Sequence, residues 1–395
     1  MPRPASATPF PAGTAEAESL LRLLDGGLLR DRSEISRFQQ EPRLDFATRD
    51  PLALRLRSGP GCALAEPCGD PAQALATRIA DALSLAGAAT FASAADASRI
   101  ALAGVMGPGD EALVDSGVDS ALFETVRATG ARPQRFPAAS LDGAERRLRR
   151  LCRQPTMGRV LIVAPAVSAH GARLTDLSAL GQLARQHGAV LVVDLSQDFG
   201  LMGPDGGGVM EIQSCLGRAD LVLGDLAPAF GTTGGFAAWR DPDPEERLRR
   251  QRPVSAFLPT DRAAAALAAA EMVFGPEGRR RRRKLQGLAL RLRNHLMADG
   301  LRVPGSAAPF VPVLLPFLTA LPRAALLQSA GPRVGLLLAP QVPLHVPRWR
   351  IELSARHGLA DIDNLADLIR DVSRAFDRVP ARSRGHAWGL TEAVT

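Results

Sequence analysis

Short apolar runs separated by helical segments are the feature that most constrains the fold of this chain. The runs lie at residues 111–115, 159–164, 189–193 and 220–223. Between two of them, residues 176–187 have helical spacing and are followed by Gly188, a usual helix stop. Strands that are buried on both faces read as continuous apolar runs, and helices supply the cover. The pattern predicts an α/β protein with a mostly parallel sheet covered on both faces.

The rest of the chain predicts a second, smaller domain. Further helices are expected at residues 15–29, 72–85, 261–272, 279–299 and 362–377, and a loop at residues 58–71. From residue 304 the chain favours short strands, and residues 348–354 alternate in polarity as a half-buried strand does. We predict an N-terminal arm and helix over residues 1–45 that joins the small domain, a large domain over 46–278 and a small α+β domain over 279–395.

The charge of the chain does not indicate a nucleic-acid partner. The formal net charge is +7, but the positive residues are almost all arginines and are spread along the chain. There is no tyrosine, and aromatic residues make up 4% of the sequence. Proteins that bind single strands need aromatic side chains for base stacking, and a binding patch needs clustered charge. We therefore expect no nucleic acid among the partners.

Neither the cysteines nor the N-terminus indicates a metal site or a membrane. The four cysteines are Cys62, Cys68, Cys152 and Cys215. They lack the paired spacing of zinc ligands and are expected to be reduced thiols. The N-terminus has no apolar core typical of a secretory signal, and no stretch approaches the ~18 apolar residues of a membrane span. We expect a cytoplasmic protein with no transmembrane segment.

Residues 224–236 carry a specific resemblance. They read Gly-Asp-Leu-Ala-Pro-Ala-Phe-Gly-Thr-Thr-Gly-Gly-Phe. This segment resembles the cofactor-lysine motif of the α-oxoamine synthases, Gly-Thr-Leu-Ser-Lys-Ala-Leu-Gly-Ser-Val-Gly-Gly-Tyr. These are pyridoxal-phosphate (PLP) enzymes that condense an amino acid with an acyl thioester. The matching positions are Gly224, Leu226, Ala229, Gly231, Gly234 and Gly235. Pro228 stands at the position of the Schiff-base lysine, and the one lysine of the chain, Lys284, lies far away.

The resemblance extends over most of the chain as an ordered series of segments. Residues 193–200, Val-Asp-Leu-Ser-Gln-Asp-Phe-Gly, resemble Val-Asp-Asp-Ala-His-Ala-Thr-Gly of the family. Residues 348–357, Arg-Trp-Arg-Ile-Glu-Leu-Ser-Ala-Arg-His, resemble Arg-Leu-Arg-Ile-Ser-Leu-Thr-Ala-Ala-His. Other matching segments are residues 44–48, 91–98, 126–132, 202–208, 252–253 and 257–259. The series implies the type I fold of PLP-dependent aspartate aminotransferase, with a mostly parallel seven-stranded sheet in the large domain.

Asp194 is the one cofactor-binding residue that the resemblance retains. It ends a predicted strand, where open α/β sheets place their ligand sites. In the family, the matching aspartate holds the ring nitrogen of PLP and keeps the pyridinium protonated. An aspartate at this place could instead cap the next turn, and the sequence leaves both roles open.

The other cofactor positions differ from the family. Asp119 replaces the histidine that stacks on the ring, and Gln197 replaces a second histidine near the ring oxygen. Ala94 and Ala95 replace the Gly-Tyr pair near the phosphate, where alanine tolerates a tight backbone approach less well than glycine. Together with Pro228, these changes predict either no cofactor or weak, non-covalent PLP binding. They also predict that no catalytic residue is retained.

Three further features leave alternatives open. Arg350 matches an arginine that grips the substrate carboxylate in the family, a task that suits the bidentate guanidinium, or it is a surface strand arginine beside Arg348. The Arg279–Lys284 run is either the solvated start of a helix or a patch for an acidic partner. Among the histidines only His357 lies in a matching segment, and the others are expected at the surface.

The resemblance leads to three hypotheses of function. The first is a non-catalytic subunit of an acyl-CoA:amino acid C-acyltransferase, as a homodimer or a heterodimer with a lysine-bearing paralogue. In that role Ser255 and residues 257–259 would reach across to the partner's site. The second is a divergent, active PLP-dependent acyltransferase of the 8-amino-7-oxononanoate synthase kind, which would need a new base in place of lysine. The third is a homodimeric pseudoenzyme that binds a small ligand.

Overall fold

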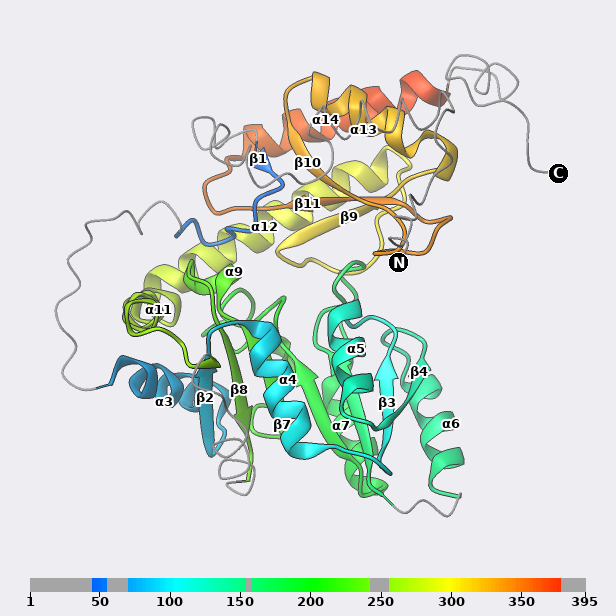
Figure 1. Ribbon diagram of the computed structural model, residues 1–395. Helices are drawn as coiled ribbons and strands as arrows, with labels where there is room; N and C mark the ends of the chain where they lie inside the picture. The colour runs from blue at the N-terminus through cyan, green and yellow to red at the C-terminus, as the bar shows by residue number, and fades with distance from the viewer. Residues whose placement is uncertain (1–44, 55–69, 154–157, 242–255, 378–395) are drawn as a thin grey trace, which may run out of the picture.

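A computed structural model describes residues 45–54, 70–153, 158–241 and 256–377 of the chain (Figure 1). The predicted helix at residues 15–29, Cys62, Cys68, Arg252 and Ser255 lie outside these residues. The described chain forms two sheets, one of seven strands and one of four. None of the described helices is long and apolar enough to cross a membrane.

The large sheet confirms the predicted mostly parallel seven-stranded architecture. Its strands are β2 (Gly87–Phe91), β3 (Glu111–Asp115), β4 (Arg132–Phe136), β5 (Val160–Pro165), β6 (Val190–Asp194), β7 (Leu221–Asp225) and β8 (Gly235–Trp239). They lie in the order β2-β8-β7-β6-β5-β3-β4. Strand β8 is antiparallel to both of its neighbours, and the pairs from β7 to β4 are parallel.

Helices cover both faces of this sheet. They are α3 (Pro71–Leu83), α4 (Ala94–Val105), α5 (Ser120–Ala128), α6 (Leu141–Leu151), α7 (Leu177–Gln186) and α11 (Thr260–Val273). Successive strand residues point to opposite faces. Ile162 packs in the core with α3, α6, α7 and α11, whereas Leu161 and Val163 pack in the core with α4 and α5. Burial on both faces explains why these strands have no polar alternation.

The four-stranded sheet forms the core of a smaller lobe. Its strands are β1 (Asp45–Phe46), β9 (Phe310–Leu314), β10 (Arg333–Leu337) and β11 (Arg348–Glu352), in the order β1-β10-β11-β9. Helices α12 (Pro276–Ala298), α13 (Ala320–Ser329) and α14 (Leu359–Asp377), with the short 3-10 helix η4 (Phe317–Thr319), complete this lobe. Phe46 pairs with β10 and packs in this core, so the chain leaves the small lobe after Phe46. The predicted limits 46–278 and 279–395 stay a prediction.

Helix α12 connects the two lobes, and it runs between them in Figure 1. Leu288 and Leu292 pack in the small-lobe core. The expected solvated character of the Arg279–Lys284 run is only partly right. Arg283 and Lys284 are exposed, but Arg282 is 5% exposed and donates hydrogen bonds to four carbonyl oxygens of the large lobe. Arg282 is therefore a structural contact between α12 and the large lobe.

Candidate functional site

The carboxyl end of β6 lies against β11 of the small lobe, and this junction holds the candidate site. The amide oxygen Oε1 of Gln197, three residues after β6, accepts a hydrogen bond of 3.0 Å from Arg350 Nη2 on β11. Asp119, at the start of α5, is close enough to raise the pKa of Asp194. The fold therefore brings Asp194, Asp119, Gln197 and Arg350 to one place, as the motif order predicts.

Asp194 is engaged by its own turn. Its Oδ1 accepts hydrogen bonds from Ser196 N at 2.9 Å and from Ser196 Oγ at 2.5 Å. The turn-capping role that the sequence left open is therefore filled by this oxygen. Burial raises the pKa of Asp194, and the nearby charges of Asp119 and Asp225 raise it further against the Ser196 hydrogen bonds. These effects make the carboxylate form of Asp194 less favourable than in a free aspartate.

Asp119 is fixed by the start of a helix. It is the N-cap of α5, and its Oδ1 accepts a hydrogen bond of 2.9 Å from Ala121 N. A carboxylate is favourable at a helix N-terminus, because it satisfies a free N–H group and complements the helix dipole. The side chain that the resemblance aligns with a stacking histidine is therefore an acid with a structural partner.

Gln197 lies between two arginines, one of which the sequence did not single out. Its Oε1 accepts hydrogen bonds from Arg350 and, at 3.1 Å, from Arg49 Nη2. Arg49 directly follows the matching segment at residues 44–48, but nothing in that segment indicated its contact with Gln197. The two residues are 148 positions apart, so this contact depends on the folded chain.

Arg350 is held by its own protein at several atoms. Its Nε donates to Glu352 Oε1 at 2.7 Å, its Nη1 donates to the Ala169 carbonyl, and its guanidinium lies over the Phe310 ring at 3.6 Å from the centroid. The side chains of Arg350 and Glu352 are 11% and 4% exposed. Arg350 is therefore not a surface strand arginine, and a carboxylate already occupies it. Glu352 stands where the family motif has serine.

His170 belongs to this site, contrary to our expectation of a surface histidine. Burial lowers its pKa, Arg350 and Arg348 lower it further, and Asp119 opposes them. Its Nδ1 is buried and has no hydrogen-bond partner among the described residues. His357, the histidine in a matching segment, is a core residue instead. Its Nδ1 accepts from Ser354 N at 3.2 Å, and its ring contacts Phe46 with centroids 4.2 Å apart.

Pro228 fits the backbone of the segment after β7 without strain. It is buried in the first turn of the short helix α9 (Ala227–Phe230), where a missing N–H costs no helical hydrogen bond. Gly231 ends this helix in the left-handed conformation with φ 69°. A Cβ at Gly235 would lie 2.5 Å from the Ala94 Cα, so this glycine is needed for packing. The glycines of the motif thus keep a structural purpose of their own.

Ala94 and Ala95 form the first turn of α4, beside the start of β8. The N-cap Ser93 accepts a hydrogen bond of 3.0 Å from Asp96 N and donates one of 2.7 Å to Asp96 Oδ2. Asp96 therefore places a negative charge in the first turn of the helix. This charge complements the helix dipole and competes with any anion that would bind there.

Lys284 lies away from Asp194, whereas the described part of the predicted cross-subunit loop lies beside the end of β2. The Lys284 ammonium donates to the Ala355 carbonyl at 2.7 Å, in a surface hollow lined also by Arg280, Arg281 and Arg356. Ser255 is outside the described residues, but Phe257 beside it is 50% exposed and forms a β-bridge with Phe91. Among the described residues, no group of three or more histidines, cysteines or acids could hold a metal ion.

Comparisons with known proteins decide the family. A model of the family "Aminotransferase class I and II" matches residues 67–369. An 8-amino-7-oxononanoate synthase of Pseudomonas aeruginosa is 32% identical over 286 residues, which are 69% of this chain and 68% of that enzyme. The chain belongs to the α-oxoamine synthase family of class I and II aminotransferase-like proteins.

Further α-oxoamine synthases give the same result for the fold. The 8-amino-7-oxononanoate synthase of Cupriavidus metallidurans is 31% identical over 266 residues, 65% of this chain and 63% of that enzyme. The chain thus spans about two thirds of the curated relatives it matches. The solved structure of a Sphingomonas wittichii serine palmitoyltransferase superposes with a TM-score of 0.74 at 21% identity, over 85% of this chain and 88% of that one. The predicted aminotransferase-like fold is confirmed.

Proposed function

We propose that this chain is a non-catalytic α-oxoamine synthase homologue that serves as a subunit of an acyl-CoA:amino acid C-acyltransferase. It would act as a homodimer or beside a lysine-bearing paralogue. The observation that carries the proposal is Pro228, which is buried in α9 and which the resemblance aligns with the Schiff-base lysine. The one lysine of the chain, Lys284, donates a hydrogen bond to the Ala355 carbonyl instead. A proline nitrogen within the chain cannot form an imine.

The residues around Asp194 do not fit tightly bound PLP. The family's stacking histidine gives way to Asp119, a carboxylate that caps α5 and adds negative charge where an anionic cofactor would lie. The pKa of Asp194 is raised by burial and by its acidic neighbours, which weakens it as a partner for a protonated ring nitrogen. We therefore propose that the chain binds no PLP or binds it weakly and without a covalent bond.

The substrate side of the site supports the same proposal. The guanidinium of Arg350 already has a buried ionic partner in Glu352, so a substrate carboxylate must either displace Glu352 or bind beside it as a second anion. Removing one member of a buried ion pair leaves an uncompensated charge, which is strongly unfavourable. A free amino acid at ordinary concentration has to compete with a carboxylate held within the same strand.

The subunit role is supported by what the chain retains. The core of the large lobe and the turn glycines are in place, although the reactive side chains differ. Phe257 stays half-exposed next to Ser255 on the loop that the resemblance assigns to the partner's site. A subunit that lends this loop needs the fold and the interface, and it needs no lysine of its own.

A ligand-binding pseudoenzyme is the second candidate, and His170 favours it. Its buried Nδ1 has no hydrogen-bond partner among the described residues, and buried polar atoms without a partner are unusual in folded proteins. A small ligand with one hydrogen-bonding group would satisfy this atom. Binding of such a ligand to the homodimer, with no effect on any paralogue, would favour this candidate over the subunit.

Absorption spectra with added PLP test the loss of the Schiff base. We expect wild-type protein to show only the spectrum of free PLP, and borohydride to fix no cofactor on the chain. Pro228→Lys should gain an imine band and a borohydride-stable adduct, because it restores an amine at the motif position. It should still have no acyl-transfer activity, since Asp119 and Glu352 are unchanged. Ala227→Lys, one residue away, is the matched control.

Two results would contradict this proposal. An imine band in the wild-type protein would mean that Lys284 or the terminal amine serves the site. Acyl transfer by the wild-type homodimer alone would show that the chain is an enzyme. The subunit role is tested separately by co-purification with a lysine-bearing paralogue from the same genome, whose activity should rise when this chain is added and stay unchanged with Phe257→Asp.

A further inference from the structure

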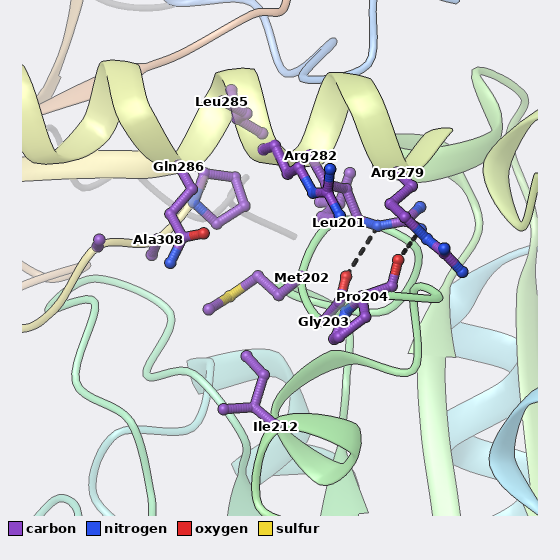
Figure 2. Close-up of a pocket in the computed structure, with 13 residues that line it drawn as sticks. Leu201, Met202, Gly203, Pro204, Ile212, Arg279, Arg282, Leu285, Gln286 and Ala308 are labelled. Atoms are coloured by element: carbon purple, nitrogen blue, oxygen red, sulfur yellow. Dashed lines mark hydrogen bonds between the residues drawn. The ribbon is translucent and has the colours of Figure 1, made fainter. Parts of the chain in front are cut away.

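A cavity of about 320 Å³ lies where the lobes meet at α12, and it shares no lining residue with the site at Asp194 (Figure 2). One wall is residues 201–204, in the turn region after β6, together with the end of the short helix α8 (Gly208–Ile212). The other walls are α12 and residues 307–309 before β9. The volume falls at the lower end of the range for small-molecule sites, about 300–1,000 Å³.

The interior of this cavity is mostly apolar. Met202 and Ile212 extend into the space beneath α12 in Figure 2, and Leu285 and Ala308 line it from the side of the small lobe. Ile212 is 49% exposed although it lies beside Met202 in the lining. An apolar ligand portion that covered Ile212 and Met202 would remove this surface from water, which is favourable.

Arg282 gives one wall a fixed shape. Its Nε donates to Gly203 O at 2.9 Å and its Nη2 donates to Pro204 O at 2.7 Å, as the dashed lines in Figure 2 show. Its Nη1 donates to the carbonyls of Gly200 and Val273. The chain's own hydrogen bonds thereby hold this loop against α12 and fix the wall of the cavity.

The mouth of the cavity carries positive charge that the protein leaves available. Arg283 is exposed and has no hydrogen bond or ion pair with any residue in the described ranges. Gln286, about one helical turn after Arg283 in α12, is also exposed and points toward the cavity in Figure 2. Arg279 lines the same mouth but pairs with Asp205. An exposed guanidinium with no partner among the described residues, beside an apolar hollow, is complementary to an anionic head on an apolar chain.

We propose that this cavity binds a small amphipathic anion, namely a medium-length aliphatic chain ending in a carboxylate. The chain would lie against Met202, Ile212 and Leu285, and the carboxylate would pair with Arg283 and accept from Gln286. Because the lining comes from both lobes, the bound ligand would contact each of them. This inference is independent of Pro228 and of the proposed subunit role.

Titration of the full chain with decanoate tests this site. Calorimetry gives the affinity, and ¹³C-methyl spectra of the methionines give the location. Decanoate should shift the Met202 signal and leave the signal of Met210, a core residue, in place. Decanol has the same chain without the charge, and inorganic phosphate has charge without a chain. Both should bind more weakly than decanoate.

Substitutions at the mouth and at the wall test separately how the carboxylate and the aliphatic chain of the ligand are bound. Arg283→Gln should weaken decanoate binding about fivefold, the upper end for an exposed ion pair, and leave decanol binding unchanged. Arg280→Gln is the matched control, because Arg280 is an exposed arginine on the same helix outside the cavity. Ile212→Asp should weaken the binding of both ligands. Ile212 is 49% exposed, and substitutions at exposed positions change stability little.

Three outcomes would overturn the proposal. They are the absence of decanoate binding, binding that leaves the Met202 signal in place, and equal affinities of decanoate and decanol in both wild type and Arg283→Gln. Circular dichroism and the unfolding midpoint of each variant show that a loss of binding comes from the site and not from the fold. A ligand-induced rise in the unfolding temperature of the wild type would add support.

Discussion

The site at the end of β6 and the cavity beneath α12 use similar side chains in opposite ways. At the end of β6, Arg350 is bound by Glu352 and Gln197, and Asp194 accepts from its own turn. At the cavity, Arg282 donates hydrogen bonds to backbone carbonyl oxygens. The adjacent Arg283 has no hydrogen-bond or ion-pair partner among the described residues. A ligand at the first site must displace an internal partner, whereas a ligand at the second displaces water.

A residue that keeps its motif position therefore need not keep its function. Arg350 keeps the motif position of a carboxylate-binding arginine, yet Glu352 supplies a carboxylate from the same strand. Conversely, Arg283 belongs to a run that the sequence assigns either to a solvated helix start or to a patch for an acidic partner, and it lines a cavity. The two arginines differ in whether the guanidinium is already engaged by another residue, and this depends on tertiary contacts.

Removal of Glu352 should have the largest effect on stability. We expect Glu352→Ala to lower the free energy of unfolding by about 3–5 kcal/mol, because Arg350 then becomes a largely buried charge without its carboxylate. Urea unfolding measures this change. The same experiment on Arg350→Ala and on the double variant gives the coupling, and the double variant should lose clearly less than the sum of the two. Additive losses would contradict an ionic pairing of these residues.

Removal of Arg282 should follow in size and tests the fixed wall of the cavity. Arg282→Ala leaves four carbonyl oxygens without their donor, and we expect a loss of about 3 kcal/mol in the free energy of unfolding. The neighbouring Arg283→Ala should change it by less than about 0.5 kcal/mol, as expected for an exposed residue. Equal losses in both variants would break the distinction between the two arginines.

Much of the fold could be predicted because it depends on local pattern. The run at residues 111–115 forms β3 with the same limits, and residues 159–164 form β5 (Val160–Pro165) with a shift of one residue. The helix predicted from residue 279 begins earlier, at Pro276, because proline is favourable in the first turn of a helix. The resemblance assigned Asp194 and Arg350 to cofactor and substrate roles, and the fold places both residues near Gln197.

The contacts that determine the state of the site could not be predicted in this way. Arg49 reaches Gln197 across 148 residues, and Arg350 reaches it across 153. His170 follows β5 in a segment with no matching motif, and its place between Arg350 and Asp119 depends on the packing of β11 and α5. Arg282 is one of several arginines in a run, and sequence alone does not show which one faces the large lobe.

Asp198 lies between the two compared regions. It is fully buried, its Oδ2 accepts from Val209 N of α8 at 2.7 Å, and its Oδ1 has no hydrogen-bond partner among the described residues. Burial raises the pKa of Asp198 well above its ordinary value of 3.8, and the charge of Asp194 raises it further. The folded state therefore binds more protons than the unfolded state above that value. Its contribution to stability is present at low pH and is lost as pH rises through the folded pKa.

Asp198→Asn should remove this pH dependence. Its effect on stability should be smaller than the effects of Glu352→Ala and Arg282→Ala. An asparagine keeps an acceptor for Val209 and cannot ionise, so the free energy of unfolding should fall less than in the wild type as pH rises above the ordinary aspartate value of 3.8. At fixed pH the two proteins should differ by about 1 kcal/mol, the ordinary effect of one substitution. Urea unfolding across this range measures both. An unchanged slope would mean that Asp198 is already ionised in the folded state, and the carboxyl would then need a cationic or donor partner at Oδ1.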